Sequence, residues 1–191
     1  MNIGVLAVQG DFAAHLRMLA RLGVEAIQVR RASELDVMDG LIIPGGESTT
    51  MLKFVEEETL GDALKSFAAS GKPIFATCAG AILVASEVTT PPQASLGLID
   101  IAVARNAYGR QVDSFISAVD TTFAGGSLEA VFIRAPRITR VGDKVITIAS
   151  REGEPVMVCE GNIIAATFHP ELTNDERAHR MFIEMAESSW T

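Results

Sequence analysis

The stretch Pro73–Leu83, PIFATCAGAIL, has the pattern of a buried strand that turns directly into a helix. Its first four residues suit a strand, and its last five are small or apolar residues with helical character. Between them lies Cys78, one of only two cysteines in the chain. A cysteine with small neighbours at such a turn has the features of a nucleophile elbow, which exposes a reactive side chain at a sheet edge. The alternative is a buried packing cysteine, but packing does not require Ala79 and Gly80 to follow it.

The segments before this stretch alternate between short β-rich runs and helical patterns. The expected strands are residues 2–8, 24–29 and 40–43, and the expected helices follow Asp11 or cover residues 48–57 and 60–69. Strands that alternate with helices imply right-handed crossovers and a parallel sheet covered on both faces. The first half therefore predicts an α/β fold.

The second half of the chain is mostly β-like. The runs are residues 99–104, 114–119, 130–133, 145–149, 156–159 and 163–167, with turn residues between them and a helix expected at 175–188. We interpret them as added, mostly antiparallel strands plus a return to the main sheet. No linker separates the halves, so we expect one domain over residues 1–191.

Composition limits the classes of function. The chain has 191 residues, of which 48% are hydrophobic, and a formal net charge of −8. The acidic balance disfavours a nucleic-acid partner, and no apolar run approaches the roughly 18 residues that span a bilayer. The N-terminus resembles a strand rather than a signal peptide, and two distant cysteines suit a reducing compartment. We expect a soluble cytoplasmic protein without nucleic-acid or membrane partners.

Four segments should meet at the carboxyl edge of the sheet, where open α/β folds bind ligands. They are Gln9-Gly10, PGGEST at 44–49, ATCAG at 76–80 and TFHPE at 167–171. His169 and Glu171 alternate on what we expect to be an extended segment, so their side chains should face the same way. A carboxylate beside a histidine orients the ring and raises its basicity, as in a nucleophilic triad.

The other candidates have plainer interpretations. His15 and His179 fall within helical patterns and have no evident partner, so we expect them to be structural, and we assign Cys159 to packing. PGGEST should form a turn with a helix cap at Ser48 or Thr49. Its glycines could also turn a backbone N–H toward a developing oxyanion, together with the N–H of Ala79. We expect neither a metal nor a cofactor.

Five segments together carry a family resemblance. PGGEST, TCAG, RNAYGRQVDSF at 105–115, FIRAP at 132–136 and FHPELT at 168–173 resemble the glutaminase subunits of pyridoxal 5′-phosphate synthases, which are class I glutamine amidotransferases. The likeness runs from GVLAVQGDF to the last helix. It implies a three-layer, flavodoxin-like fold. It also implies that Cys78 is the nucleophile, His169 the general base and acid, and Glu171 its orienter.

The resemblance implies further roles and a partner. The glutamine pocket would comprise Gly46, Glu47, Ser48, Arg105, Ile133 and Arg134, and the oxyanion hole Gly46 and Ala79. Ammonia would pass to a synthase subunit that makes pyridoxal 5′-phosphate, in an assembly of twelve copies of each subunit. The glutaminase would work only when docked, with the loop at residues 44–46 completing the oxyanion hole.

Two positions depart from the family pattern, and three alternatives remain open. Ala76 stands where the family usually has glycine, and Ile116 stands where it often has an acidic residue. The chain could instead serve another synthase, for example in histidine or purine synthesis. It could also be a cysteine-dependent protease or redox sensor of related architecture, or a non-catalytic subunit that only binds.

Overall fold

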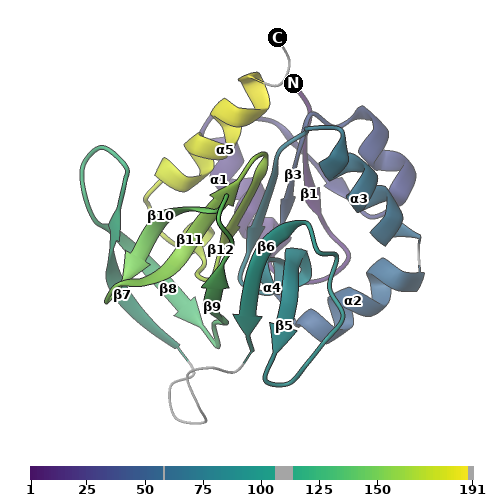
Figure 1. The fold of residues 1–191 in the computed structure, drawn as a ribbon. Helices are drawn as coiled ribbons and strands as arrows, with labels where there is room; N and C mark the ends of the chain where they lie inside the picture. Colours follow the sequence, from purple (N-terminus) through teal and green to yellow (C-terminus); the bar gives the residue numbers. More distant parts are fainter. Residues whose placement is uncertain (58, 106–113, 189–191) are drawn as a thin grey trace.

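A nine-stranded sheet forms the centre of the molecule in the computed structural model, which describes residues 1–57, 59–105 and 114–188 (Figure 1). Its strands are β1 (Ile3–Leu6), β2 (Ala26–Val29), β3 (Gly40–Ile43), β4 (Ile74–Thr77), β7 (Ser114–Thr121), β8 (Leu128–Ile133), β10 (Ile146–Arg151), β11 (Glu154–Glu160) and β12 (Ile163–Ala166). Their order is β2-β1-β3-β4-β12-β11-β10-β7-β8. The pairs from β2 to β12 are parallel, and those from β12 to β8 are antiparallel. The predicted parallel sheet with an antiparallel extension is therefore confirmed.

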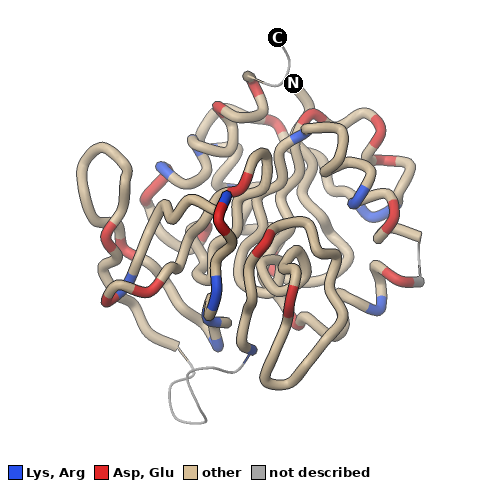
Figure 2. The backbone as a smooth tube through the Cα atoms, viewed as in Figure 1, with Lys and Arg blue, Asp and Glu red and all other residues tan. Residues whose placement is uncertain are grey.

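Helices cover both faces of the parallel strands. They are α1 (Phe12–Arg21), α2 (Ser48–Glu57), α3 (Leu60–Ala69), α4 (Ala79–Val84) and α5 (Arg177–Ser188), with short 3₁₀ segments η1 (Ala32–Val37) and η2 (Pro170–Leu172). Successive side chains of a strand point to opposite faces, so Val5 packs with the α1 and α5 side chains and Leu6 with those of α2 and α3. The strands β1, β3, β4 and β12 carry no charged residue, and Figure 2 shows the charges outside this centre. Burial on both faces explains why these strands are continuously apolar.

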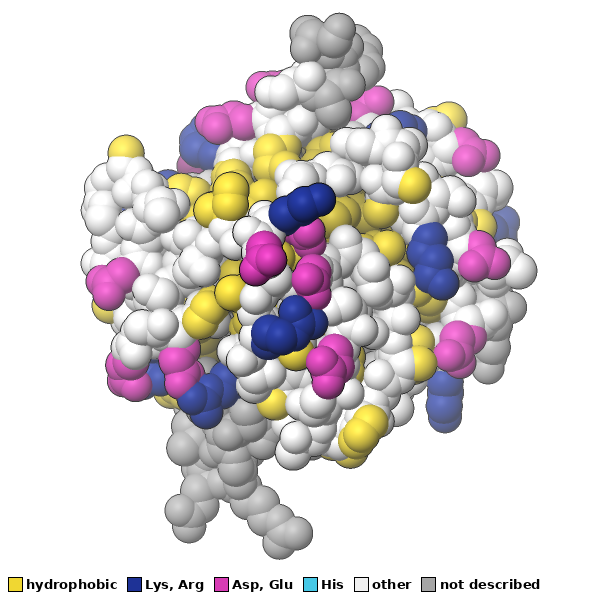
Figure 3. All heavy atoms as spheres, in the orientation of Figure 1, with side chains coloured by type: hydrophobic (Ala, Val, Ile, Leu, Met, Phe, Trp, Pro, Cys, Tyr) yellow, Lys and Arg dark blue, Asp and Glu magenta, His cyan; other side chains and the backbone are white. Residues whose placement is uncertain are grey.

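A second, three-stranded sheet packs on the α2–α4 side. It consists of β5 (Ala85–Thr89), β6 (Ile99–Ala104) and β9 (Arg137–Val141), in the order β5-β6-β9. Basic and acidic side chains lie next to one another on this face of the molecule (Figure 3), and one pair is Arg140 with Asp100 at 2.8 Å. The sequence did not indicate β5, because it follows α4 without a turn, or β9, whose five residues include two arginines.

Strand β12 returns to the main sheet beside β4 and so determines which segments meet at the carboxyl edge of the sheet. β12 lies beside β4 in parallel, with Ala165 opposite Ala76 and Ala166 opposite Thr77. Both strands thus end at the same level, and the Cys78 N–H donates to the Ala166 carbonyl at 2.8 Å. The segment after β12 therefore emerges next to the turn after β4. In the part of the chain that the structure describes, no helix is long and apolar enough to cross a membrane.

Candidate active site

Cys78 occupies a strained turn between β4 and α4. Its φ of 48° and ψ of −104° are unusual for a residue with a side chain, and such strain costs on the order of 1–3 kcal/mol. The following helix begins against β3, where a Cβ on Gly80 would collide with the Ile43 carbonyl oxygen. Glycine at position 80 is thus required by this close approach, and the turn is the predicted nucleophile elbow.

The unusual Ala76 does not disturb this turn. Its side chain is fully buried in the apolar layer shared with α2–α4, and the residue pairs with Ile43 on one side and Ala165 on the other. The extra methyl group therefore contributes to packing. The other departure, Ile116, is 64% exposed on β7.

His169 and Glu171 form the predicted pair, although not on an extended segment. The His169 Nδ1–H donates to Glu171 Oε1 at 2.7 Å, and both residues are buried. Residues Pro170–Leu172 form a 3₁₀ turn, so the expectation of an extended chain was wrong. The turn itself brings the carboxylate back under the ring. His169 is further fixed because its backbone N–H donates to the Val131 carbonyl at 2.8 Å.

The environment of His169 favours its protonated form. Burial lowers the pKa of His169, but hydrogen bonds and charge interactions with Cys78 and Glu171 outweigh burial and raise that pKa to about 10. At neutral pH the ring is therefore an imidazolium between the thiol and the carboxylate. An imidazolium stabilises an adjacent thiolate, the nucleophilic form of cysteine, and can protonate a leaving amine.

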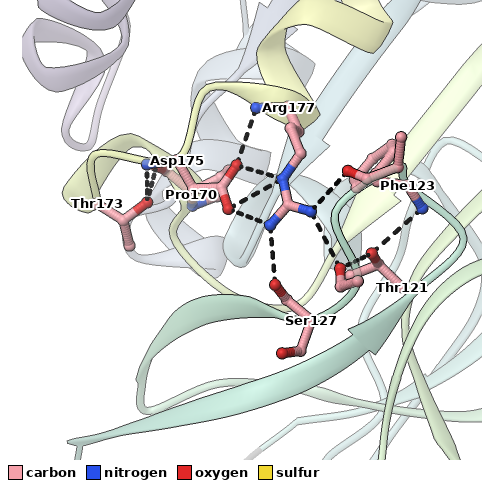
Figure 4. A network of polar contacts seen from close by, with 9 residues as sticks. Thr121, Phe123, Ser127, Pro170, Thr173, Asp175 and Arg177 are labelled. Carbon is pink, nitrogen blue, oxygen red and sulfur yellow. Dashed lines mark hydrogen bonds and ion pairs between the residues drawn. The ribbon is translucent and has the colours of Figure 1, made fainter.

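A polar network anchors the chain that follows the triad. Figure 4 shows the Arg177 guanidinium, at the start of α5, bonded to Asp175 and to backbone carbonyls of the turn between β7 and β8. Thr173 adds a hydrogen bond to the Pro170 carbonyl at 3.2 Å. This network holds residues 170–177 against the antiparallel strands and so restrains the segment that carries His169 and Glu171.

A cavity of about 340 Å³ opens in front of Cys78 and His169. It is lined by Asp11, Gly45, Gly46, Glu47, Ser48, Cys78, Ala79, Ile82, Arg105, Ile133, Arg134, Pro136, His169 and Leu172. All six residues expected to form a glutamine pocket thus lie at one cavity, as does Ala79. A volume of this order suits a small metabolite. The Ile133 carbonyl lies 3.8 Å from the Cys78 Sγ, so this residue reaches the thiol through its backbone.

The expected pocket residues Glu47 and Ser48 already have partners. The Glu47 carboxylate accepts the N–H groups of Thr49 and Thr50 and thereby caps α2, so the cap is Glu47 rather than the expected Ser48 or Thr49. The hydroxyls of the two threonines, followed by their N–H groups, lower the pKa of Glu47 to about 2 despite partial desolvation. The Ser48 hydroxyl donates to Gln93 Oε1 at 3.1 Å, and no sequence signal pointed to Gln93.

Two arginines supply positive charge to the cavity. Within residues 1–57, 59–105 and 114–188, neither the Arg105 nor the Arg134 guanidinium has a hydrogen bond or ion pair. The backbone of Arg134, which lines the cavity, has a φ of 45°, a left-handed conformation that is uncommon for a residue other than glycine. Arginines at the cavity that also holds a nucleophile suit a substrate that carries a carboxylate. Most of the RNAYGRQVDSF segment, residues 106–113, lies outside the described residues.

Gly45 allows the loop after β3 to approach the triad. A Cβ at this position would collide with the His169 ring and would lie 3.1 Å from the Cβ of Cys78. The Gly45 carbonyl accepts the Asp11 N–H at 3.2 Å, which fastens this loop to the segment after β1. The predicted meeting of four segments at the sheet edge is thus observed.

The expectation that His15 and His179 have no partner was wrong. His15 Nδ1 lies 3.0 Å from His179 Nε2, and His15 Nε2 lies 3.2 Å from Thr77 Oγ1 and 3.4 Å from Glu171 Oε2. Both histidines are fully buried. They lie directly behind the triad, on the side away from the cavity. Among the described residues, no cluster of histidine, cysteine and carboxylate side chains suits a metal ion.

Comparison with known proteins gives the family. Residues 5–188 match the SNO glutamine amidotransferase family. The chain belongs to this family. Similar curated proteins named pyridoxal 5′-phosphate synthase subunit PdxT come from Koribacter versatilis (51% identical, covering 97% of this chain and 95% of the relative) and Thermotoga maritima (50%, covering 97% and 99%).

Solved structures support the same assignment. A crystal structure of a glutamine amidotransferase is 45% identical, covers 97% of this chain and 98% of its own, and superposes with a TM-score of 0.92. A structure of PurLQS from Thermotoga maritima shares only 17% identity at a TM-score of 0.70, so it shows the fold alone. In a glutamine amidotransferase, an elbow cysteine beside a protonated histidine is suited to attack on a carboxamide.

Proposed function

We propose that this chain is the glutaminase subunit of a pyridoxal 5′-phosphate synthase, hydrolysing L-glutamine to L-glutamate and ammonia. The observation that carries the proposal is the placement of Cys78, in a strained elbow, beside the His169–Glu171 pair at a cavity that Arg105 and Arg134 also line. The choice of synthase rests on relatives about half identical over nearly their whole length, which bear the name PdxT. We propose that residues 1–191 act as one domain.

The reaction begins at the sulfur. The Cys78 thiolate attacks the side-chain carbonyl carbon of glutamine and forms a tetrahedral intermediate. His169 gives its proton to the nitrogen, the C–N bond breaks, and ammonia leaves a γ-glutamyl thioester on Cys78. His169, now neutral, takes a proton from water as the water attacks the thioester, and glutamate and the thiolate are released. Glu171 keeps the ring oriented throughout.

The negative oxygen of each tetrahedral intermediate needs hydrogen-bond donors. We assign the backbone N–H groups of Ala79 and Gly46 to this role, because both residues line the cavity and Ala79 opens α4, whose first N–H groups have no partner within the helix. Arg105 and Arg134 suit the α-carboxylate of glutamine. Glu47, Ser48 and the backbone of Ile133 complete the pocket.

The fate of ammonia suggests the partner. Ammonia acts as a nucleophile only while unprotonated, and release into water would protonate and lose it. We therefore propose that the chain docks on a synthase subunit, in an assembly of twelve copies of each, with the loop at residues 44–46 completing the oxyanion hole on docking. Both cysteines are free thiols, which suits a cytoplasmic setting.

Glutaminase activity measured with and without the synthase subunit tests the proposal. We expect glutamate release and pyridoxal 5′-phosphate formation from glutamine in the complex, and little glutamate release from the chain alone. Transfer of ammonia only to a synthase of purine or histidine formation would contradict the assigned partner. Full-speed thioester formation by the isolated chain would contradict activation by docking.

A further inference from the structure

A buried polar cluster lies behind the triad and is not needed to bind substrate. It comprises His15 on α1, His179 on α5, Thr77 at the end of β4 and the inner oxygen of Glu171. All four side chains are buried, and none of these residues lines the cavity. Because α1 and α5 are separated by most of the chain, the cluster exists only in the folded protein. The Glu171 carboxylate thus has one oxygen facing His169 and the other facing this cluster.

The inner oxygen of Glu171 is an unusual acceptor. Glu171 Oε1 accepts the His169 N–H at 2.7 Å, but Oε2 has no hydrogen bond of standard geometry among the described residues, although its side chain is fully buried. The polar atom recorded beside Oε2 is His15 Nε2, at 3.4 Å. A buried carboxylate oxygen without a donor is costly, so the protonation of His15 decides whether Glu171 is supported or repelled.

The protonation of the two histidines follows from their contacts. Burial, and then the neighbouring His179 and His169, hold the pKa of His15 well below its usual value. Burial, and then the charge of Arg21, lower the pKa of His179 to about 4. Both rings are therefore neutral at pH 7 and each carries one proton. Only one of them can donate in the contact between His15 Nδ1 and His179 Nε2.

Two tautomeric arrangements satisfy that contact, and they differ at its ends. If His15 donates from Nδ1, its bare Nε2 faces the Glu171 carboxylate, and His179 holds a buried Nδ1–H without an acceptor. If His179 donates from Nε2, His15 carries its proton on Nε2, toward Glu171 Oε2 and Thr77 Oγ1. His179 Nδ1 is then a bare nitrogen. Since His179 Nδ1 has no partner among the described residues, the second arrangement leaves no buried ring N–H unpaired, and it keeps a bare nitrogen lone pair away from the Glu171 carboxylate.

We propose that His15 is a positioning residue of this enzyme: its Nε2–H, oriented by His179 and shared with Thr77, holds the inner oxygen of Glu171 so that the outer oxygen faces His169. In this arrangement His179 donates a hydrogen bond to His15, and His15 donates to the inner oxygen of Glu171. His169 donates to the outer oxygen of the same carboxylate. The carboxylate is thus held from both sides. The proposal rests on the glutaminase activity proposed above.

A positioning role for His15 predicts that loss of its N–H donor changes kcat more than KM. Removal of the His15 donor leaves Glu171 free to turn, and the His169 ring then loses its fixed orientation toward Cys78. Substrate binding occurs on the other side of the triad, so kcat should fall while KM stays within about twofold. The loss should be about tenfold, by analogy with the lower end of the range for removal of a hydrogen-bonding partner of a metal-binding histidine.

Near-isosteric variants separate the hydrogen bond from packing. His15→Gln keeps an N–H donor at the end of a side chain of similar length, whereas His15→Met does not. In the complex with the synthase subunit, we expect His15→Met to lose kcat about tenfold and His15→Gln to recover most of it. In a Glu171→Ala background the two variants should have equal kcat. Leu19→Ala, in the apolar packing of the same helix, is the control and should lower stability without changing kcat per folded molecule.

The contrary results are distinct. Equal kcat for His15→Met and His15→Gln, or the same difference between them without the Glu171 carboxylate, would overturn the positioning role. An inactive wild-type complex would instead contradict the proposed function. Nitrogen-15 NMR of the wild-type chain tests the tautomer without any variant or activity: we expect a protonated Nε2 and a bare Nδ1 on His15. The opposite tautomer, or a doubly protonated ring at pH 7, would overturn the proposal.

Discussion

The two cysteines are almost equally buried, at 6% exposed for Cys78 and 8% for Cys159, but their surroundings differ. Cys159 lies within strand β11, where it pairs with Ile146 and Ile164, and its thiol lies 3.6 Å from the Gly161 carbonyl. Burial, and then the charge of Glu160, raise the pKa of the Cys159 thiol. Cys78 instead has a strained backbone and a protonated histidine beside it. Burial therefore does not distinguish a reactive cysteine here, whereas backbone strain and a cationic partner do.

Substitution of each cysteine tests this comparison with the largest expected effect. Cys78→Ala should reduce glutamate release by the complex at least about a thousandfold, because no other group can form the thioester. Cys159→Ala should keep activity within about twofold and cost about 1 kcal/mol of stability through lost packing. Glutamate release and urea unfolding measure the two effects. Assembly with the synthase subunit should survive in both variants, and residual turnover by Cys78→Ala would contradict its role as nucleophile.

Gly45→Ala tests the crowding around Cys78. The new methyl group would collide with the His169 ring, so either the ring or the loop must move. We expect a loss of about a hundredfold in kcat, since a displacement of about 1 Å at reacting groups has this effect. Gly23→Ala is a suitable control, because that glycine has a φ of +76° and nothing within 4 Å of an added Cβ. It should lose about 1 kcal/mol of stability and no activity. Unchanged kcat in Gly45→Ala would show that the loop lies elsewhere in the active complex.

His169→Gln separates the two thiols by their reactivity. Iodoacetamide alkylates thiolates, and loss of the imidazolium should slow the reaction of Cys78 at pH 7 about tenfold. Cys159 should react slowly in the wild type and in the variant, because its pKa is raised by burial and no histidine contacts it in the described structure. Peptide mass spectrometry after timed alkylation reports both sites in one sample. Equal rates at Cys78 in the two proteins would exclude activation by His169.

The last test concerns the stability, rather than the activity, of the layer of buried histidines behind Cys78. The native pKa of His179, about 4, lies below the unfolded value near 6.5, so the unfolded chain takes up a proton first as the pH falls. Stability should be complete above pH 6.5 and decrease toward pH 4, by about 3 kcal/mol over the full range. His15 acts in the same direction. His179→Phe should show a shallower decrease in urea unfolding between pH 6.5 and pH 4.5, and an identical slope would contradict a neutral buried His179.

Local sequence patterns predicted the elbow and the main sheet well. β1, β3 and β4 are apolar runs because both faces are covered, and Gly80 marks the contact between α4 and β3. The pairing of His169 with Glu171 was predicted from their spacing, although a 3₁₀ turn rather than an extended segment brings them together. These features depend on neighbouring residues, so their patterns are visible in the sequence.

Contacts between distant segments were not predicted. His15 and His179 lie 164 positions apart, and only the packing of α1 beside α5 brings their rings together. The position of His15 on the apolar side of its helix, near Met18 and Leu19, was the available signal for a buried role. Gln93, which binds Ser48, lies in a loop without any repeating pattern. Such partners depend on tertiary packing, which no local pattern encodes.

The most direct test of the central claim is identification of the covalent intermediate. The complex with its synthase subunit should be mixed with glutamine, quenched in acid within one turnover, digested and analysed by mass spectrometry. We predict a γ-glutamyl group on the peptide that contains Cys78, and none on the peptide that contains Cys159. Release of ammonia with no acyl group on Cys78, or an acyl group on Cys159, would contradict the account.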